Sequence, residues 1–143
     1  MIEVKELNKN FDAVKAIDNV SARIEEGHVF GLIGTNGAGK STFMRMLSGV
    51  LKPDSGTILI DGREVYDNPE TKADILYISD DQYYFTNGTP MDVVRLYQTY
   101  YPQFDTEKFM DLMEKFGLEI KRKINTFSKG MKRQAAIILA LSC

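Results

Sequence analysis

The sequence from position 34 to position 41 reads Gly34-Thr35-Asn36-Gly37-Ala38-Gly39-Lys40-Ser41, which satisfies the pattern GxxxxGK(S/T). Directly before it, the compact apolar run from Val29 to Ile33 predicts a β-strand. After it, apolar side chains recur at helical spacing and predict a helix over residues 40–51, which the breaker cluster at 52–56 closes. A glycine-rich stretch between a strand and a helix is the setting in which this pattern forms a phosphate-binding loop.

The residue types of this stretch suit a ligand that carries several negative charges. Glycines let backbone N–H groups line a concave loop, and a helix that begins near Lys40 directs its positive dipole end to the same place. We expect Lys40 to act as the catalytic lysine on the β- and γ-phosphates, Ser41 to ligate Mg²⁺ and Thr42 to donate to the α-phosphate. The candidate loop residues are Gly34, Asn36, Gly37, Ala38, Gly39, Lys40, Ser41 and Thr42. The alternative is a glycine-rich turn that binds no ligand.

The rest of the chain divides into two halves. Residues 2–24 and 57–65 read as β structure, with one turn predicted at residues 8–10 and another at Asp61-Gly62, and residues 75–78 read as a further strand. Beyond them, apolar stripes predict helices over residues 91–101 and 109–116 and a third helix from Ser128 to the end. The expected fold class is therefore α/β, with an α/β half to about residue 80 and a helical half after it.

Composition narrows the class of protein further. The chain has 143 residues, of which 43% are hydrophobic and 27% charged, and these near-average values argue against a disordered or coiled-coil chain. A net charge of −2 makes a dedicated nucleic-acid binder a poor fit, and the single cysteine, Cys143, excludes an intrachain disulfide. No signal peptide is visible at the start, and the apolar run from Ala135 to Leu141 is about a third of the ~20 residues that cross a bilayer. We therefore expect a soluble chain.

A second stretch lies at the start of the third predicted helix and reads Thr126-Phe127-Ser128-Lys129-Gly130-Met131-Lys132-Arg133-Gln134. Ser128 suits the N-cap of that helix. Gly130 in the first turn is less easily explained, because glycine weakens a helix by about 1 kcal/mol relative to alanine. A bulky group that approaches the backbone closely would account for it, whereas an ordinary helix N-terminus is the plainer interpretation.

Together the two stretches resemble the ATP-binding subunit of ABC transporters, in which a phosphate loop is followed by a helical subdomain that opens with a signature similar to LSGGQ. Residues 127–131 occupy that place, with Phe for Leu, Lys for the first Gly and Met for Gln. The Ser and the second Gly remain, as Ser128 and Gly130. The resemblance implies ATP with Mg²⁺ as ligand, and a head-to-tail pair in which these two residues contact the ATP held by the other copy.

The resemblance assigns roles to a few other positions. Phe11 falls where the family has an aromatic side chain that stacks on adenine, although it also reads as an apolar edge residue of the first hairpin. The family has a glutamine near the end of the strand predicted at residues 75–78, where it senses Mg²⁺ and touches the transporter. Here Asp80 and Gln82 are equal candidates for that task, and both also read as solvated turn residues. The candidate metal ligands are thus Ser41, Asp80 and Gln82.

The resemblance also implies that residues 1–143 form the N-terminal part of one ABC ATPase domain. Residues 1–80 would hold a β subdomain and a P-loop NTPase core with an incomplete sheet, and residues 81–143 an α-helical subdomain. In the family, the Walker B strand and the catalytic glutamate follow the signature helix, and no such strand occurs before Cys143. We therefore expect these residues alone to be inactive in ATP hydrolysis and prone to pair through an open strand edge.

For the whole protein, the resemblance implies an ATPase that couples ATP binding and hydrolysis to transport through a separate membrane permease. We expect it to act as an exporter, in the cytoplasm at the inner face of the membrane, with residues 86–101 as the docking surface. The first alternative is a soluble ABC-type ATPase that acts on ribosomes or DNA. The second is a phosphate-loop kinase or GTPase, which leaves the stretch at Ser128 unexplained.

Overall fold

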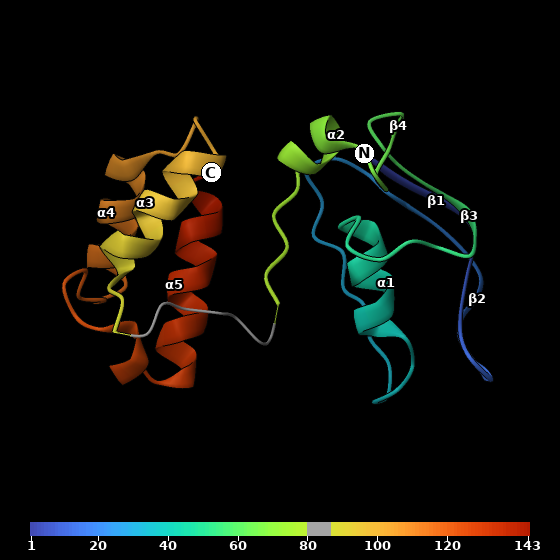
Figure 1. Ribbon diagram of the computed structural model, residues 1–143, viewed down its shortest axis with the longest axis horizontal. Coiled ribbons are helices and arrows are strands. Elements are labelled where there is room, and N and C mark those ends of the chain that lie inside the picture. The colour runs from blue at the N-terminus through green and yellow to red at the C-terminus, as the bar shows by residue number, and fades with distance from the viewer. Residues whose placement is uncertain (80–86) are drawn as a thin grey trace. The chain divides into compact units, whose positions relative to one another are not determined.

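The computed structural model describes residues 1–79 and 87–143 (Figure 1). The chain separates into two compact units, Met1–Tyr77 and Ile78–Cys143. We refer to them as unit 1 and unit 2 and describe each by itself. In the described parts of the chain, no helix has the length and apolar character that a bilayer crossing requires.

Unit 1 is built on a four-stranded antiparallel sheet with the order β2-β1-β3-β4. Its strands are β1 (Ile2–Phe11), β2 (Val14–Ile24), β3 (Ser55–Ile60) and β4 (Arg63–Glu64). Helix α1 (Lys40–Leu47) packs against this sheet, and the short helix α2 (Pro69–Ala73) follows β4. The core that sheet and helix share consists of Val4, Leu7, Ile17, Phe43, Met46, Leu47, Ile58 and Val65.

The two predicted turns of unit 1 have different outcomes. The turn at Asp61-Gly62 is confirmed, since both residues have positive φ, 49° and 76°, and join β3 to β4. The turn predicted at residues 8–10 is wrong, because these residues lie inside β1 and the chain reverses after Phe11. Their polar groups are satisfied there by long-range partners: the backbone N–H of Asn19 donates to Asn8 Oδ1, and that of Asp54 donates to the Asn8 carbonyl.

The two apolar stretches predicted as strands at 29–33 and 75–78 are not strands in the described structure. A β-strand requires a hydrogen-bonded neighbour, and within residues 1–79 and 87–143 neither stretch has one. Val29 and Ile33 are accordingly almost fully exposed, at 103% and 96%. The prediction for these stretches rested on composition alone, which does not supply the partner.

Unit 2 is helical, as the apolar stripes predict. Helices α3 (Pro90–Tyr100), α4 (Thr106–Lys115) and α5 (Lys129–Leu141) are joined by loops and a short 3-10 helix, η1 (Ile124–Thr126). The core consists of Val93, Val94, Phe104, Phe109, Met113, Leu118, Ile124, Phe127, Ala135, Ile138 and Leu139. Each helix begins at a residue whose side chain accepts a hydrogen bond from the first turn, namely Thr89, Asp105 and Ser128. These caps explain where the three helices start.

Candidate functional site

The stretch at 34–41 forms the loop that leads into helix α1 (Figure 1). The N-cap of α1 is Gly39, which has φ 82° and offers no side-chain cap to the helix. The first N–H groups of a helix have no partner within the helix, so in α1 they remain available to an external acceptor. The first turn also contains no acidic side chain. This helix end therefore has the donors and the dipole direction that an anion requires.

Gly39 also fixes the loop against strand β2. A Cβ atom at this position would lie 2.2 Å from the carbonyl oxygen of Ala16 and 3.0 Å from Ile17 Cδ1. Gly37 has a similar φ of 85°, but a Cβ there would meet nothing within 4 Å. The two glycines thus serve different needs: both allow the left-handed backbone, whereas only Gly39 allows close approach to the sheet.

Lys40 stabilises the curled shape of the loop. Its Nζ donates to the carbonyl oxygens of Gly34 at 2.7 Å and of Thr35 at 2.6 Å, and the Ala38 N–H donates to the same Thr35 oxygen at 3.2 Å. An ammonium group has three donors. Two of them bind the loop, so one is left to point at a ligand while the positive charge is held in place.

The other predicted loop residues surround this centre. Asn36, Ala38 and Ser41 are exposed, and Thr42 is half-buried in the first turn of α1. Gly34 has little room, since a Cβ there would lie 3.3 Å from Ala38 Cβ. Ser41 fits a Mg²⁺ ion that takes most of its ligands from phosphate and water, as this ion commonly does. No group of three His, Cys, Asp or Glu side chains in the described ranges could hold a metal ion without such help.

Phe11 lies on the same sheet as Ala16, the residue against which Gly39 packs. It is the last residue of β1, it pairs with Val14, and 46% of its surface is exposed. Val14 is two residues, or about 7 Å, from Ala16, the residue that Gly39 contacts. The hairpin end that carries Phe11 and the loop also lie at the same end of unit 1 in Figure 1. Unit 1 therefore carries both an exposed aromatic ring and a phosphate-type loop.

The predicted residues of unit 2 lie at the start of α5. Ser128 is the N-cap, and its Oγ accepts from the backbone N–H of Met131 at 3.2 Å. The hydroxyl hydrogen remains able to donate. Gly130 has no positive φ, and the nearest atom that a Cβ would meet is Ser128 Oγ at an ordinary 3.9 Å. Nothing within the described part of this unit therefore requires a glycine at this position.

Two other predicted positions, Asp80 and Gln82, lie outside the described residues. Sequence reasoning also missed two residues that contact the Phe11 region, Lys9 and Asp54. Lys9 Nζ lies 5.6 Å from the centroid of the Phe11 ring, and Asp54 accepts hydrogen bonds from Lys9 and Asn10. Asp54 is more than 40 positions from both partners in sequence, so no local pattern reveals these contacts.

Comparisons with known proteins agree with this geometry. A family model described as "ABC transporter" matches residues 17–143. The chain is 34% identical over 142 residues to the ABC transporter ATP-binding protein YtrB of Bacillus subtilis, covering 99% of this chain and 49% of YtrB. It is 29% identical to the xylose/arabinose import ATP-binding protein XylG of Sulfolobus acidocaldarius, covering 99% of this chain and 61% of XylG.

A solved structure has a similar fold. The dimeric, post-hydrolysis structure of the ATP-binding cassette MJ0796, bound to ADP and Pi, matches with a TM-score of 0.81 over 99% of this chain and 69% of that one, at 21% identity. At this identity the likeness shows the fold alone. The described chain therefore has the cassette fold, as the expected α/β class with a P-loop NTPase core implies. In length it spans about half of YtrB.

Proposed function

The chain belongs to the ABC transporter family of ATP-binding proteins, and on that premise we propose that it binds Mg-ATP at the loop 34–41 and works as the ATPase subunit of a transporter. One observation carries the proposal. The Lys40 ammonium is already held inside the loop by the Gly34 and Thr35 carbonyls, beside a helix end with unpaired N–H donors. A triphosphate is the ligand whose charge and length match this arrangement.

In this proposal, different residues of unit 1 bind different parts of the nucleotide. Lys40 directs its remaining donor to the β- and γ-phosphates. The backbone N–H groups of the loop donate to the phosphate oxygens. Thr42 donates to the α-phosphate. Phe11 offers its exposed ring to the adenine. Ser41 would hold the Mg²⁺ ion, which would neutralise part of the phosphate charge.

The residues of unit 2 act on a second copy of the chain. In this proposal, the Ser128 hydroxyl and the N–H groups at the start of α5 contact the γ-phosphate of ATP held by the partner, in a head-to-tail dimer. The support is physical: Gly130 costs helix stability, and no contact in the described part of the chain requires it. A bare backbone is useful there only when something approaches from outside.

The partner of the whole protein is, in this proposal, a membrane-embedded permease that the ATPase contacts from the cytoplasmic face. Relatives such as YtrB are named as ATP-binding proteins of ABC transporters, which favours transport over the ribosome and DNA alternative. The export direction expected from the sequence stays a prediction, and XylG is named as an import protein. The roles of Asp80 and Gln82 stay predictions as well.

Calorimetric titration of the chain with Mg-ATP and with AMP tests the binding proposal. We expect saturable binding of ATP and binding of AMP at least 10-fold weaker, because AMP lacks the phosphates that Lys40 would contact. Light scattering should then show that Mg-ATP roughly doubles the mass measured without nucleotide. Equal affinity for ATP and AMP, or no binding of either, would contradict the assignment of the loop.

A further inference from the structure

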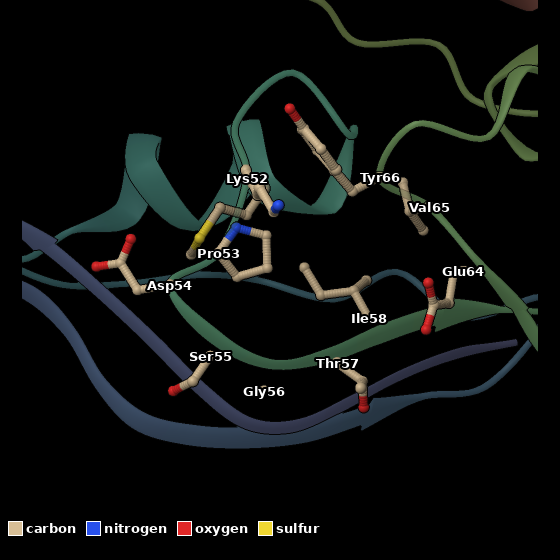
Figure 2. Close-up of a pocket in the computed structure, with 11 residues that line it drawn as sticks. Lys52, Pro53, Asp54, Ser55, Gly56, Thr57, Ile58, Glu64, Val65 and Tyr66 are labelled. Carbon is tan, nitrogen blue, oxygen red and sulfur yellow. The ribbon is translucent and has the colours of Figure 1, made fainter.

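Asp54 makes several contacts and has no role in the nucleotide binding proposed above. It lies in the loop between α1 and β3, at one side of a hollow of about 350 Å³. Figure 2 shows Glu64, Val65 and Tyr66 at the other side of this hollow, with the Asp54 carboxylate directed away from them. The carboxylate instead accepts from Lys9 Nζ at 2.6 Å and from the Asn10 backbone N–H at 2.7 Å. These two residues directly precede Phe11.

The backbone around Asp54 is fixed against strand β1. Its N–H donates to the carbonyl oxygen of Asn8 at 2.9 Å. Two residues later, Gly56 has φ 87°, and a Cβ there would lie only 2.5 Å from the Glu6 carbonyl oxygen. The start of β3 therefore lies close against β1, and these backbone contacts place residue 54 beside Lys9 and Asn10.

Lys9 connects this carboxylate to the aromatic ring. Its side chain is only 14% exposed, while its Nζ both pairs with Asp54 and lies 5.6 Å from the centroid of the Phe11 ring. A cation over one face of a ring is attracted to it and limits the ring's orientation. The ring remains about half exposed, so it has surface left for another planar group.

We propose that Asp54 is a positioning residue that orients Phe11 for adenine through Lys9 and the Asn10 backbone, an inference that rests on the proposed function. One segment of chain would then serve both ends of the nucleotide. It begins as the phosphate loop, continues through α1, and ends in the loop that carries Asp54. The same segment would bind the triphosphate directly and set the aromatic contact for the base.

The test compares two ligands that share phosphates and differ in the base. Calorimetric titrations with Mg-ATP and with Mg-tripolyphosphate are made on the parent chain, on Asp54→Ala, on Phe11→Ala and on the double variant. We expect Asp54→Ala to weaken ATP binding roughly 3- to 10-fold and to leave tripolyphosphate binding within about 2-fold, because only the ring contact is lost. The double variant should bind ATP as Phe11→Ala does, since both substitutions remove one contact.

Two further variants keep the test decisive. Asp18→Ala removes a carboxylate whose ion pair with Lys15 lies on β2, and should change neither affinity. Lys9→Met keeps an apolar stem, removes the link to the ring and should reproduce the selective loss of ATP affinity, even where Asp54→Ala folds poorly. An equal loss for both ligands in Asp54→Ala and Lys9→Met, or no loss, would overturn the positioning role while leaving the proposed function intact. Failure of the parent chain to bind ATP would overturn the proposed function itself, and this inference with it.

Discussion

Gly39 of unit 1 and Gly130 of unit 2 both lie at a helix start within a motif that predicts phosphate contact, yet their surroundings differ. A Cβ at Gly39 would collide with the Ala16 carbonyl oxygen at 2.2 Å, in a backbone conformation with φ 82°. A Cβ at Gly130 would meet its nearest neighbour at 3.9 Å, in ordinary helical backbone. The fold of unit 1 itself requires its glycine, whereas nothing in the described part of unit 2 requires Gly130.

The comparison distinguishes the part of the proposed site that one copy of the chain forms by itself from the part that needs a second copy. The phosphate loop is shaped by its approach to β2 and by Lys40, so its form is supported by contacts within unit 1. The start of α5 has only a capping serine and a glycine that lowers helix stability. Such a feature makes physical sense when its partner is another molecule. In our proposal that molecule is ATP on a second copy.

The largest effect is expected from Gly39→Ala. The new methyl group requires a left-handed backbone and displacement of the Ala16 carbonyl, which together should lower the free energy of unfolding by about 3 kcal/mol. Gly37→Ala is the matched control, because it shares the positive φ and has open space around it, and about 1 kcal/mol is expected there. Urea unfolding followed by circular dichroism measures both. Equal losses would show that the contact with β2 is unimportant.

The next effect concerns binding. Lys40→Met removes a charged donor from the loop, and ATP affinity should fall roughly 10- to 150-fold, which corresponds to the 1.5–3 kcal/mol of a charge-assisted hydrogen bond. Lys115→Met, which removes an ammonium from an exposed pair on α4, is the control and should bind ATP as the parent chain does. Calorimetric titration gives both affinities. An affinity that survives Lys40→Met would place the nucleotide elsewhere.

The sequence predicted the parts of this comparison that depend on local pattern. The glycine loop before α1, the Asp61-Gly62 turn and the Ser128 N-cap each follow from neighbouring residues, and each is found. Helix α1 ends at Leu47 rather than at 51, because Gly49 leaves the helix with φ 67°. The three long helices of unit 2 were predictable for the same reason, since an apolar stripe and a cap act within a few residues of each other.

What the sequence did not reveal depends on distant partners. The polar run at residues 8–10 looks like a turn until the bonds to Asn19 and Asp54 are known, and these connect residues 11 or more positions apart. The stretches at 29–33 and 75–78 have strand-like composition, but the described residues give them no pairing neighbour. The contact of Gly39 with Ala16 likewise arises from packing. Pattern predicts an element's type, and only tertiary structure supplies its neighbours.

A smaller effect of opposite sign is expected in unit 2. Gly130→Ala should raise the free energy of unfolding by about 0.5–1 kcal/mol, since alanine favours the helix and fits the available space. Gly117→Ala is the contrast, because φ 65° makes alanine unfavourable there, and stability should fall by about 1 kcal/mol. Light scattering in Mg-ATP adds the functional half of the test. Gly130→Ala should prevent the ATP-dependent rise in mass, and a stabilised variant that still dimerises would remove the support for a contact between copies.

The smallest effect is a pH dependence, which can be tested through one carboxylate in each unit. Asp92 accepts from the backbone N–H and the side-chain hydroxyl of Thr89 at the start of α3, and these bonds lower the pKa of Asp92 below its ordinary value of 3.8. In unit 1, the Lys9 ammonium and the Asn10 N–H lower the pKa of Asp54. A carboxyl group with a lower pKa in the folded state stabilises the fold above its unfolded pKa, and this contribution is lost as pH falls through the folded value.

The free energy of unfolding of the parent chain should therefore decline below about pH 4. Asp92→Asn should remove the part of this pH dependence that comes from Asp92 in unit 2. Urea midpoints of the two proteins are compared at pH 7 and at pH 2.5. The difference between them should be largest at pH 7, where the carboxylate binds Thr89, and should shrink at pH 2.5, which lies below the ordinary carboxyl pKa of 3.8. Asp54→Asn should behave in the same way for unit 1. A difference that stays constant with pH would contradict this account. It would mean that the asparagine side chain destabilises the start of α3 through its shape, and that the charge of the carboxylate makes no contribution.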